Sequence, residues 1–440
     1  MARLALLGGR KAVTATAVSS TWPRFSSKAI GAVARLLARG KGISLGRSSI
    51  VLDAERMFAE FHGVRYALAV NTGTASLHCA VAGCNIAPGD EVITSPYSWG
   101  ATTGCILHQG AVPVFADVLA DSGLIDPADV QRKITPRTRG IVVVHIYGQP
   151  CDMRPLRRIA RRHGLALIED CSQAHGAMYR GRLVGGFGDA AGFSCMGGKL
   201  LAATELGMFI TSNRQTYDRA MLASMHPARL WLEPKPHGGG LTRPYRKYID
   251  SLSLNYRTSD IPCLLLMDQL PHLKRWNRSR AANRDHLAAA VADLGLVRFP
   301  SYPRHEQPVY HMATLRYDQE KAGGVTRETF AAALSAEGVG AFTYVRSPIP
   351  TWLRLQGRSY DGPANMWIPA LRRAGVRYDP GDIPVCMKLA RETSLQMSFN
   401  NFTEPEPRLM AQYAQAFHKV AENLPALLRW QKRRPSKARK

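Results

Sequence analysis

The stretch of sequence that decides the fold runs from Ile168 to Thr211 and reads IEDCSQAHGAMYRGRLVGGFGDAAGFSCMGGKLLAATELGMFIT. Asp170 stands just after the apolar run from Leu165 to Ile168, and Lys199 follows 29 positions later. Lys199 comes after two glycines, precedes an apolar segment and is the only charged residue in positions 190–204. A lysine buried in such a setting has a lowered pKa and a free amine.

This lysine and this aspartate together suit the chemistry of pyridoxal phosphate. A lysine amine forms a Schiff base with the aldehyde of that cofactor, and a carboxylate at the pyridine nitrogen keeps the ring able to accept electrons. Asp170 also ends a predicted strand, and ligands of open α/β sheets bind at the carboxyl ends of strands. The alternatives are a surface lysine and an aspartate that caps a helix or a turn.

Two further segments extend the candidate site. Residues 71–76, NTGTAS, follow a predicted strand and open a predicted helix. Phosphate binds backbone N–H groups at a helix N-terminus together with small hydroxyl side chains. Gly73 and Thr74 supply both, although the same turn also suits an ordinary N-cap. Trp99 is a candidate to lie on the flat pyridine face, its alternative being a core aromatic residue.

An α/β organisation is indicated by the alternation of apolar runs and amphipathic stretches between about residues 50 and 215. Such alternation is typical of a sheet with helices on both faces. The predicted strands are 66–70, 91–94, 112–116, 140–145, 166–169, 192–194 and 207–211. The predicted helices are 54–62, 74–82, 98–108, 127–134 and 153–163.

A chain of 440 residues is long enough for a large domain and a smaller one. We expect a large cofactor-binding domain with the N-terminal segment over 1–290, a small α+β domain over 291–428 and a basic tail over 429–440. Residues 227–250 contain four prolines and three consecutive glycines and are expected to form a long loop. One long helix is predicted over 261–290, and loops dominate the prediction for 350–385.

The formal charge of +25 is concentrated at the two ends of the chain. Residues 1–52 and 429–440 together contain 16 Lys or Arg and no acid, which leaves an excess of +9 for the rest. Basic tails are usually solvated, and the sequence contains no nucleic-acid-binding motif. No apolar run approaches the roughly 20 residues that span a bilayer. We therefore expect neither nucleic acid nor membrane as a partner.

The eight cysteines are expected to be buried thiols. None forms a C-x-x-C pair, and no cysteine cluster has histidines at zinc spacing, so no metal site is predicted. Free thiols indicate a reducing compartment. The acid-free first 50 residues resemble a transit peptide in composition, but frequent Arg and Ala throughout the chain produce the same composition. The expected location is the cytoplasm.

The chain resembles the sugar and cyclitol aminotransferases of the DegT/DnrJ/StrS type over roughly residues 20–425. The resemblance rests on NTGTASLH, APGDEVITSPYSW, GAVPVFADV, VVHIYGQPCDM, IEDCSQAHGA, VGGFGDAAGFS with its lysine, and LNYR followed by DQL. It implies the aspartate aminotransferase-like fold, type I, with a large mixed-sheet domain and a smaller C-terminal α+β domain. It also implies pyridoxal 5′-phosphate as the cofactor.

The resemblance implies a role for each residue at the cofactor's ring. Lys199 would carry the cofactor as a Schiff base and move the proton between the substrate carbon and the cofactor. Asp170 would pair with the ring nitrogen. Gln173 would lie by the phenolic oxygen, and Trp99 would stack on the ring.

At the phosphate, the resemblance implies Gly73, Thr74 and Ser194 from the same chain. Asn255 would reach the phosphate in the neighbouring subunit, so the active sites would be shared within a homodimer. His175 lies in one of the matching blocks but has no role that we can assign.

Two features of this chain bear on its activity. Relatives that remove a sugar hydroxyl have histidine at position 199, so the lysine favours amino transfer. After the lysine, the family usually has Gly-Glu-Gly-Gly, whereas this chain has Thr204-Glu205-Leu206-Gly207. The two replaced glycines are expected to narrow or redirect a loop near the substrate.

The predicted reaction transfers an amino group from glutamine or glutamate to a ketone. The acceptor is a free ketocyclitol of the inosose type, as in aminocyclitol antibiotic pathways, or a nucleotide-linked ketosugar. We slightly favour the ketocyclitol. Two further alternatives are an enzyme similar to aminohydroxybenzoate synthases and a catalytically inactive regulatory relative.

Overall fold

The computed structural model describes residues 2–17, 21–40, 46–250, 252–352, 355–356, 371 and 375–433. Its centre is a seven-stranded sheet in the order β1-β9-β8-β5-β4-β2-β3. Strand β9 runs antiparallel to both of its neighbours, and the other pairs are parallel. The bounds are β1 Tyr66–Val70, β2 Glu91–Thr94, β3 Val112–Phe115, β4 Thr138–Val144, β5 Ala166–Asp170, β8 Ala190–Ser194 and β9 Gly207–Thr211. The predicted large mixed sheet is confirmed.

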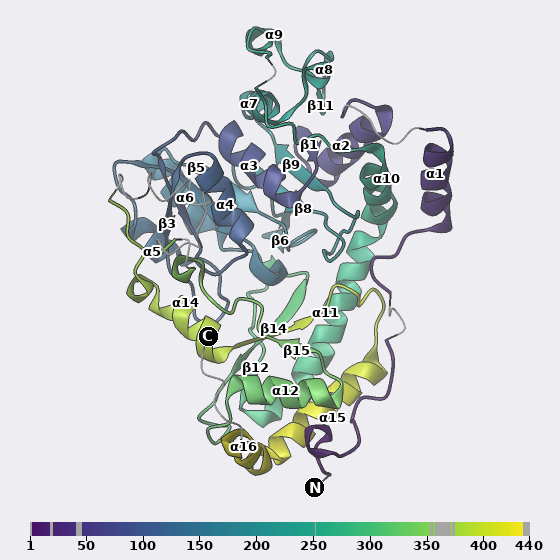
Figure 1. The fold of residues 1–440 in the computed structure, drawn as a ribbon, viewed down its shortest axis with the longest axis vertical. Coiled ribbons are helices and arrows are strands. Elements are labelled where there is room, and N and C mark those ends of the chain that lie inside the picture. Colours follow the sequence, from purple (N-terminus) through teal and green to yellow (C-terminus); the bar gives the residue numbers. More distant parts are fainter. Residues whose placement is uncertain are drawn as a thin grey trace.

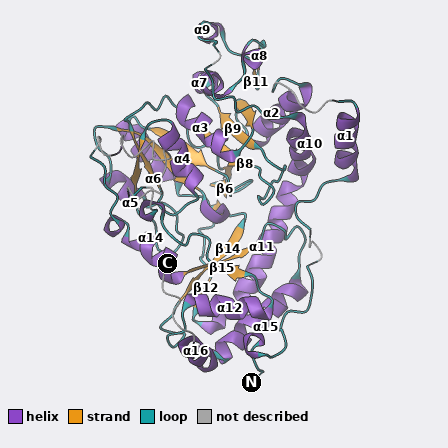
Figure 2. Ribbon diagram, in the orientation of Figure 1, coloured by secondary structure: helices purple, strands orange, loops and turns teal. Residues whose placement is uncertain are grey.

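The strands of this sheet are apolar along their length because both faces are covered. In β4, Ile141 and Val143 belong to one buried cluster, whereas Val142 between them belongs to another. Successive side chains of a strand point to opposite faces, so the two clusters mark two layers of helix packing. Figure 2 shows the helices around the strands. They are α2 Ser49–His62, α3 Gly73–Gly83, α4 Gly100–His108, α5 Pro127–Arg132, α6 Met153–His163 and α7 Arg214–Ser224.

Helix α6 illustrates how the local sequence sets the helix bounds. The Asp152 side chain accepts a hydrogen bond from the Arg154 N–H at the start, and Gly164 ends the helix with a φ of 63°. Both features are common at helix ends. A capping side chain accepts from a backbone N–H that has no partner within the helix, and glycine readily adopts the left-handed conformation that ends it. The buried positions recur at helical spacing and are Met153, Leu156, Ile159 and Ala160.

The connection between the two parts of the chain is helical but interrupted. The structure has α10 Asp260–Gln269, the 3₁₀ turn η3 Leu270–His272 and α11 Leu273–Ala290 where one helix over 261–290 was predicted. Pro271 lies in the turn and has no N–H to donate to the preceding helix, which explains the break. Helix α11 runs from the large sheet toward the second sheet (Figure 1).

The second sheet is antiparallel, with the order β12-β14-β16-β15. Its strands are β12 Val297–Arg298, β14 Met312–Tyr317, β15 Ala341–Phe342 and β16 Ser394–Ser398, and nearby helices are α12 Arg327–Glu337, α14 Pro384–Lys388, α15 Pro407–Glu422 and α16 Leu424–Arg433. The predicted smaller α+β part is confirmed. Leu4 belongs to this core, and the Ala5 N–H donates to Glu337 Oε1 at 2.7 Å. The start of the chain therefore packs with its C-terminal part.

The exact division at residues 290 and 428 stays a prediction. Of the basic tail, only 429–433 are described, as the end of α16, and most of the predicted loop region 350–385 lies outside the described residues.

Smaller elements complete the fold: α1 Ser27–Ala38, η1 Ala5–Leu7, η2 Ile146–Gly148, η4 Ala292–Leu294, η5 Ile349–Thr351, η6 Pro380–Asp382, the π turn η7 Leu389–Thr393, and the small sheet of β6 Met178–Tyr179, β7 Arg182–Leu183 and β13 Glu306–Gln307.

The segment 227–250 is more ordered than the predicted long loop. It contains α8 Pro227–Leu230, β10 Pro234–Lys235, β11 Gly238–Gly239 and α9 Arg243–Arg246, at the top of Figure 1. Arg229 anchors it from a fully buried position, with its guanidinium 2.6 Å from Glu55 Oε2 and donating to the Gly239 carbonyl at 3.0 Å. This buried, hydrogen-bonded ion pair holds the segment against the large domain, although its proline and glycine content predicts no regular structure.

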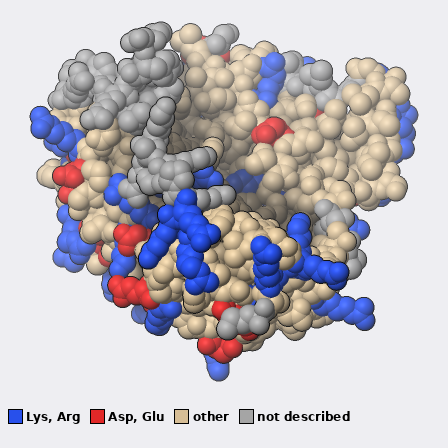
Figure 3. Space-filling view, turned by 60° about the horizontal axis from the view of Figure 1, so that its bottom comes forward, with Lys and Arg blue, Asp and Glu red and all other residues tan. Residues whose placement is uncertain are grey.

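The surface carries charges of both signs. Figure 3 shows several groups of Lys and Arg on one face, with fewer Asp and Glu between them. Among the described residues, no helix combines the length and the apolar character that crossing a membrane would require.

Thr204 stands in the left-handed region, with a φ of 60°, in the loop between Lys199 and β9. A β-branched residue there is strained by roughly 1–3 kcal/mol. The family resemblance implies glycine at this position, and glycine adopts this backbone conformation without strain.

We predict that Thr204→Gly raises the free energy of unfolding by about 1 kcal/mol, since relief of strain exceeds the extra entropy of glycine in the unfolded chain. Thr204→Ala is the matched control, because it keeps the Cβ and the strain. Urea denaturation of the three proteins measures the effect. A glycine variant less stable than the parent protein would contradict the prediction.

Candidate active site

Lys199 lies in a turn that follows β8, with its N–H donating to the Met196 carbonyl at 2.9 Å. Its side chain is partly buried. Burial lowers the pKa of the Lys199 amine, and the negative charge of Asp170 opposes that shift. Lys199, in the turn after β8, therefore lies beside the strand that ends at Asp170, and burial disfavours the charged form of its amine.

Asp170 ends β5, in register with Gly192 of β8, and is buried. Its Oδ2 accepts a hydrogen bond from the Thr102 hydroxyl at 2.7 Å, and its Oδ1 accepts one from the Ser172 N–H at 3.0 Å. Each oxygen keeps a further lone pair, so the carboxylate can accept another N–H.

Gln173 and Trp99 both lie near the side chain of Tyr344. The Gln173 side chain accepts from the Tyr147 N–H at 2.7 Å and donates to the Tyr344 hydroxyl at 3.1 Å. The Trp99 ring centroid is 6.5 Å from that of Tyr344. Trp99 is 65% exposed, so the core alternative for this residue is wrong. An exposed indole ring beside a site of this kind is available to a flat ligand.

The start of α3 meets the end of β8. A Cβ atom added to Gly73 would lie 2.3 Å from the Ser194 Cβ, so this approach requires glycine. The Thr72 side chain caps the helix by accepting from the Ala75 N–H at 3.1 Å, and Thr74 is exposed. The first N–H groups of a helix have no partner within it, so those of Gly73 and Thr74 are available to an anion.

Asn255 lies in the segment between α9 and α10. It is exposed, has a φ of 52°, and accepts a hydrogen bond from the Arg257 guanidinium through its side-chain oxygen. The neighbouring Tyr256 carbonyl accepts from the Asn71 N–H at 2.8 Å, next to the start of α3. Its expected contact with a second subunit stays a prediction.

These residues fit pyridoxal phosphate. The fit rests on a desolvated amine, a buried carboxylate with free lone pairs, an exposed indole ring and a glycine-dependent helix start. They correspond to the aldehyde, the ring nitrogen, the ring face and the phosphate of the cofactor, in that order. Lys199, Asp170, Trp99 and Gly73 would hold it.

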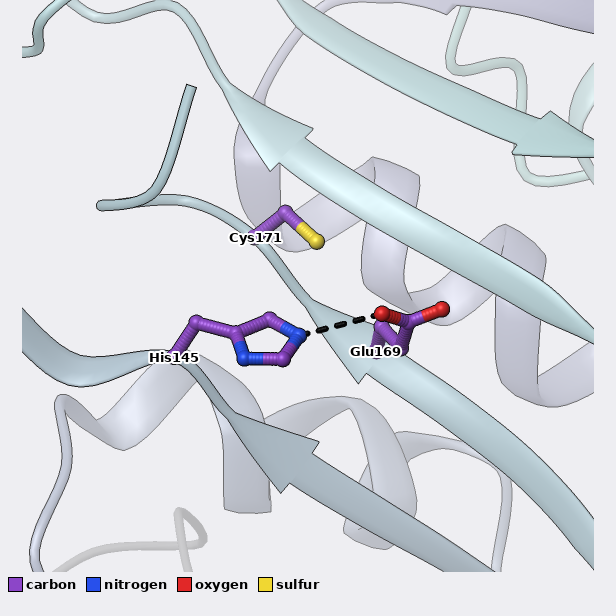
Figure 4. Close-up of side chains that lie close together, drawn as sticks. All are labelled: His145, Glu169 and Cys171. Carbon is purple, nitrogen blue, oxygen red and sulfur yellow. Dashed lines mark hydrogen bonds and ion pairs between the residues drawn. The ribbon is translucent and has the colours of Figure 1, made fainter. Parts of the chain in front are cut away.

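Another cluster, His145, Glu169 and Cys171, has the residue types of a metal site (Figure 4). His145 Nδ1 accepts from the Cys151 N–H at 2.9 Å, so its Nε2 carries the proton and donates to Glu169 at 3.1 Å. Burial raises the pKa of the Cys171 thiol well above its usual range, which favours the neutral form. Glu169 also accepts from the N–H groups of Gly185, Phe187 and Gly188. We interpret the cluster as structural, because a metal ion would have to displace these bonds.

Leu206, at the second position where the family resemblance implies glycine, packs in the core. Leu206 is fully buried in the cluster that also contains Phe193 and Leu200, and its carbonyl accepts from the Cys195 N–H at 2.7 Å. The loop after the lysine is therefore held by a core side chain on one side.

The sequence did not point to Thr102 or Tyr344. Thr102 lies three positions after Trp99, one helical turn along α4, and this spacing was the signal that could have placed it near the site. Tyr344 comes from a part of the chain with mixed patterns, and its contact with Gln173 joins residues 171 positions apart. No local pattern predicts such a contact.

Comparisons with known proteins identify the family of this chain. Residues 24–360 match the model of the DegT/DnrJ/EryC1/StrS aminotransferase family. The L-glutamine:scyllo-inosose aminotransferase of Streptomyces griseus is 34% identical, and the alignment covers 92% of this chain and 94% of that protein. The L-glutamine:2-deoxy-scyllo-inosose aminotransferase of Streptomyces fradiae is 32% identical over 91% of this chain and 93% of its own.

A solved structure gives the same result for the fold. The aminotransferase from Psychrobacter cryohalolentis superposes with a TM-score of 0.78 at 26% identity, covering 92% of this chain and 99% of that one. The fold, the paired lysine and aspartate and the family match over most of the chain lead to one conclusion: this chain belongs to the DegT/DnrJ/EryC1/StrS aminotransferase family.

Proposed function

We propose that this enzyme transfers the amino group of glutamine to a ketocyclitol of the inosose type, in the biosynthesis of an aminocyclitol antibiotic. The observation that carries the proposal is similarity to glutamine:inosose aminotransferases along nearly the whole chain, at 34% identity for the Streptomyces griseus enzyme. The presence of lysine at position 199 supports amino transfer as the reaction.

Pyridoxal phosphate, when bound, supplies an aldehyde that condenses with amines and a ring that accepts electrons. Lys199 Nζ would then move the proton of the substrate carbon, which requires the uncharged amine that burial favours. Asp170 would keep the ring nitrogen protonated, and the Thr102 hydroxyl holds the carboxylate that does so. Lys199 follows β8 and Asp170 ends the neighbouring strand β5, so the two residues proposed for these roles lie at the same edge of the sheet.

The remaining residues would bind and orient. Trp99 would cover one face of the ring, and Gln173 would lie by its phenolic oxygen, fixed by Tyr147 and Tyr344. The phosphate would be bound at the start of α3. The residues for this are Gly73, Thr74 and Ser194.

We also propose a cytoplasmic homodimer in which the partner subunit's Asn255 completes the phosphate site. The support is its exposure in the single chain, at a surface where two large apolar side chains are also exposed. These are Leu252, which is 88% exposed, and Leu254, which is 53% exposed. Burial of such side chains between two subunits would remove apolar surface from water.

The substrate assignment is tested with purified enzyme, isotope-labelled glutamine or glutamate, and a panel of inososes and nucleotide-linked ketosugars. We expect label in the product with glutamine and an inosose, at a kcat/KM at least about tenfold above that for any ketosugar, because one poorly matched polar contact changes binding by about 1–3 kcal/mol. A higher value with a nucleotide-linked ketosugar would identify that alternative acceptor instead.

The shared site is tested by mixing two variants that are impaired in different parts of the site. Lys199→Ala removes the amine and should abolish turnover, while Asn255→Ala should weaken cofactor retention. After the two proteins are unfolded together and refolded, mixed dimers contain one site with both native residues, so about a quarter of the parent activity should return if the subunits pair at random. Each variant refolded alone is the control. Failure of the mixture to exceed these controls would contradict a shared site.

A further inference from the structure

The backbone of Lys199 is held from outside its own loop. The indole N–H of Trp22 donates to the Lys199 carbonyl at 2.9 Å. The side-chain amide of Asn400 donates to the carbonyl of Gly198 at 2.8 Å. Two consecutive carbonyls of the lysine turn are therefore bound by residues that are 177 and 202 positions away in the sequence.

Arg280 joins these two donors to each other. Its guanidinium donates to the Asn400 carbonyl at 2.6 and 3.2 Å and lies over the Trp22 ring, 5.2 Å from the centroid. Trp22 also packs edge-on against Trp276 of the same helix α11, with ring centroids 5.4 Å apart. These contacts form a closed circuit that runs from Lys199 through Trp22, Arg280 and Asn400 back to Gly198, the residue before Lys199.

The lysine turn needs such support because of its composition. Gly197 has open space where its Cβ would be, and Gly198 is approached only by the flexible Met196 side chain. Glycine has more backbone freedom than any other residue, so two in succession leave the direction of the Lys199 side chain undetermined by the turn itself. Contacts from outside must determine it.

Arg280 is a charged residue buried in the interior, where a charge is costly. Its side chain is fully buried, and the described residues place no carboxylate within ion-pair distance of it. Burial lowers the pKa of Arg280 to about 9. An apolar residue of similar size would fill the space without the cost of burying a charge, so its hydrogen bonds and its ring contact must supply a benefit.

A second connection ties the same N-terminal segment to the lysine loop. The Gln269 side chain donates to the Arg24 carbonyl at 3.1 Å and accepts from the Ala202 N–H at 2.8 Å. Gln269 thus links the chain just after Trp22 to the chain just after Lys199.

We propose that Trp22, Arg280 and Asn400 are positioning residues that hold the Lys199 peptide and so direct its amine at the reacting atoms. This inference rests on the proposed aminotransferase function for its kinetic consequence. The structural consequence, a restrained turn over residues 196–203, does not depend on the substrate or on the reaction.

The test uses two conservative variants with matched controls. Trp22→Phe keeps an aromatic ring for Arg280 but removes the N–H that binds Lys199. Arg280→Lys keeps the charge but loses the two-pronged contact with Asn400. The controls are Trp231→Phe, at a ring that is 58% exposed, and Arg278→Lys, at an exposed arginine of the same helix.

The first measurement is hydrogen exchange of the cofactor-free full-length protein, followed by peptide. We expect exchange over residues 196–203 to become roughly tenfold faster in both variants, with the rest of the chain and both controls unchanged. Unchanged exchange in that peptide would overturn the proposal. A uniform increase over the whole chain would overturn it as well, since that result would assign the residues to general stability.

The second measurement is steady-state kinetics of the cofactor-loaded enzyme with glutamine and the acceptor found in the substrate panel. We expect kcat to fall by about tenfold or more while KM for glutamine stays within about twofold, because the variants misdirect the amine and leave donor binding intact. A rise in KM at unchanged kcat would contradict the positioning role. If no acceptor is found, the proposed function fails, whereas hydrogen exchange still decides the restraint of the turn.

Discussion

The proposed site depends on a partly buried amine whose charge interacts with that of a buried carboxylate. Burial disfavours the ammonium form of Lys199, and the charge of Asp170 favours it. A lysine left in water would be protonated at neutral pH, and one buried without a nearby acid would be costly to charge at all. In the function that we propose, these two opposing effects would let the amine exchange a proton with the substrate.

The sheet makes this balance possible because neighbouring strands bring distant residues to one edge. Asp170 ends β5, and β8 beside it leads into the lysine turn. Helix α3 starts against Ser194 at the same edge, in contact so close that only glycine fits at position 73. With neighbouring strands about 4.8 Å apart, the residues that we propose for the ring and for the phosphate lie along one edge of the sheet.

The sequence predicted the parts of the fold that depend on local patterns. The bounds of β1, β2, β9 and α6 agree with the prediction, because apolar runs, helical spacing and end signals lie within each segment. The break at Pro271 interrupts a pattern that is otherwise continuous, so periodicity alone missed it. The buried Arg229–Glu55 pair gave no signal, since arginine and glutamate are usually exposed and the two residues are 174 positions apart.

The same distinction holds for the site. Lys199 and Asp170 could be recognised from residue type and surroundings, whereas the residues that hold them in place could not. Thr102, Tyr344 and the circuit through Trp22 and Arg280 act through contacts between distant segments. At position 204, the resemblance implies a glycine where this chain has threonine, but only the φ of 60° shows that this threonine has a left-handed backbone.

The most direct test of the central claim is reduction of the cofactor-loaded protein with borohydride, which converts a Schiff base into a stable secondary amine. The account predicts that, after digestion and peptide mass spectrometry, the cofactor is attached to the peptide containing Lys199. Attachment to a different lysine, or no attachment at all, would contradict it.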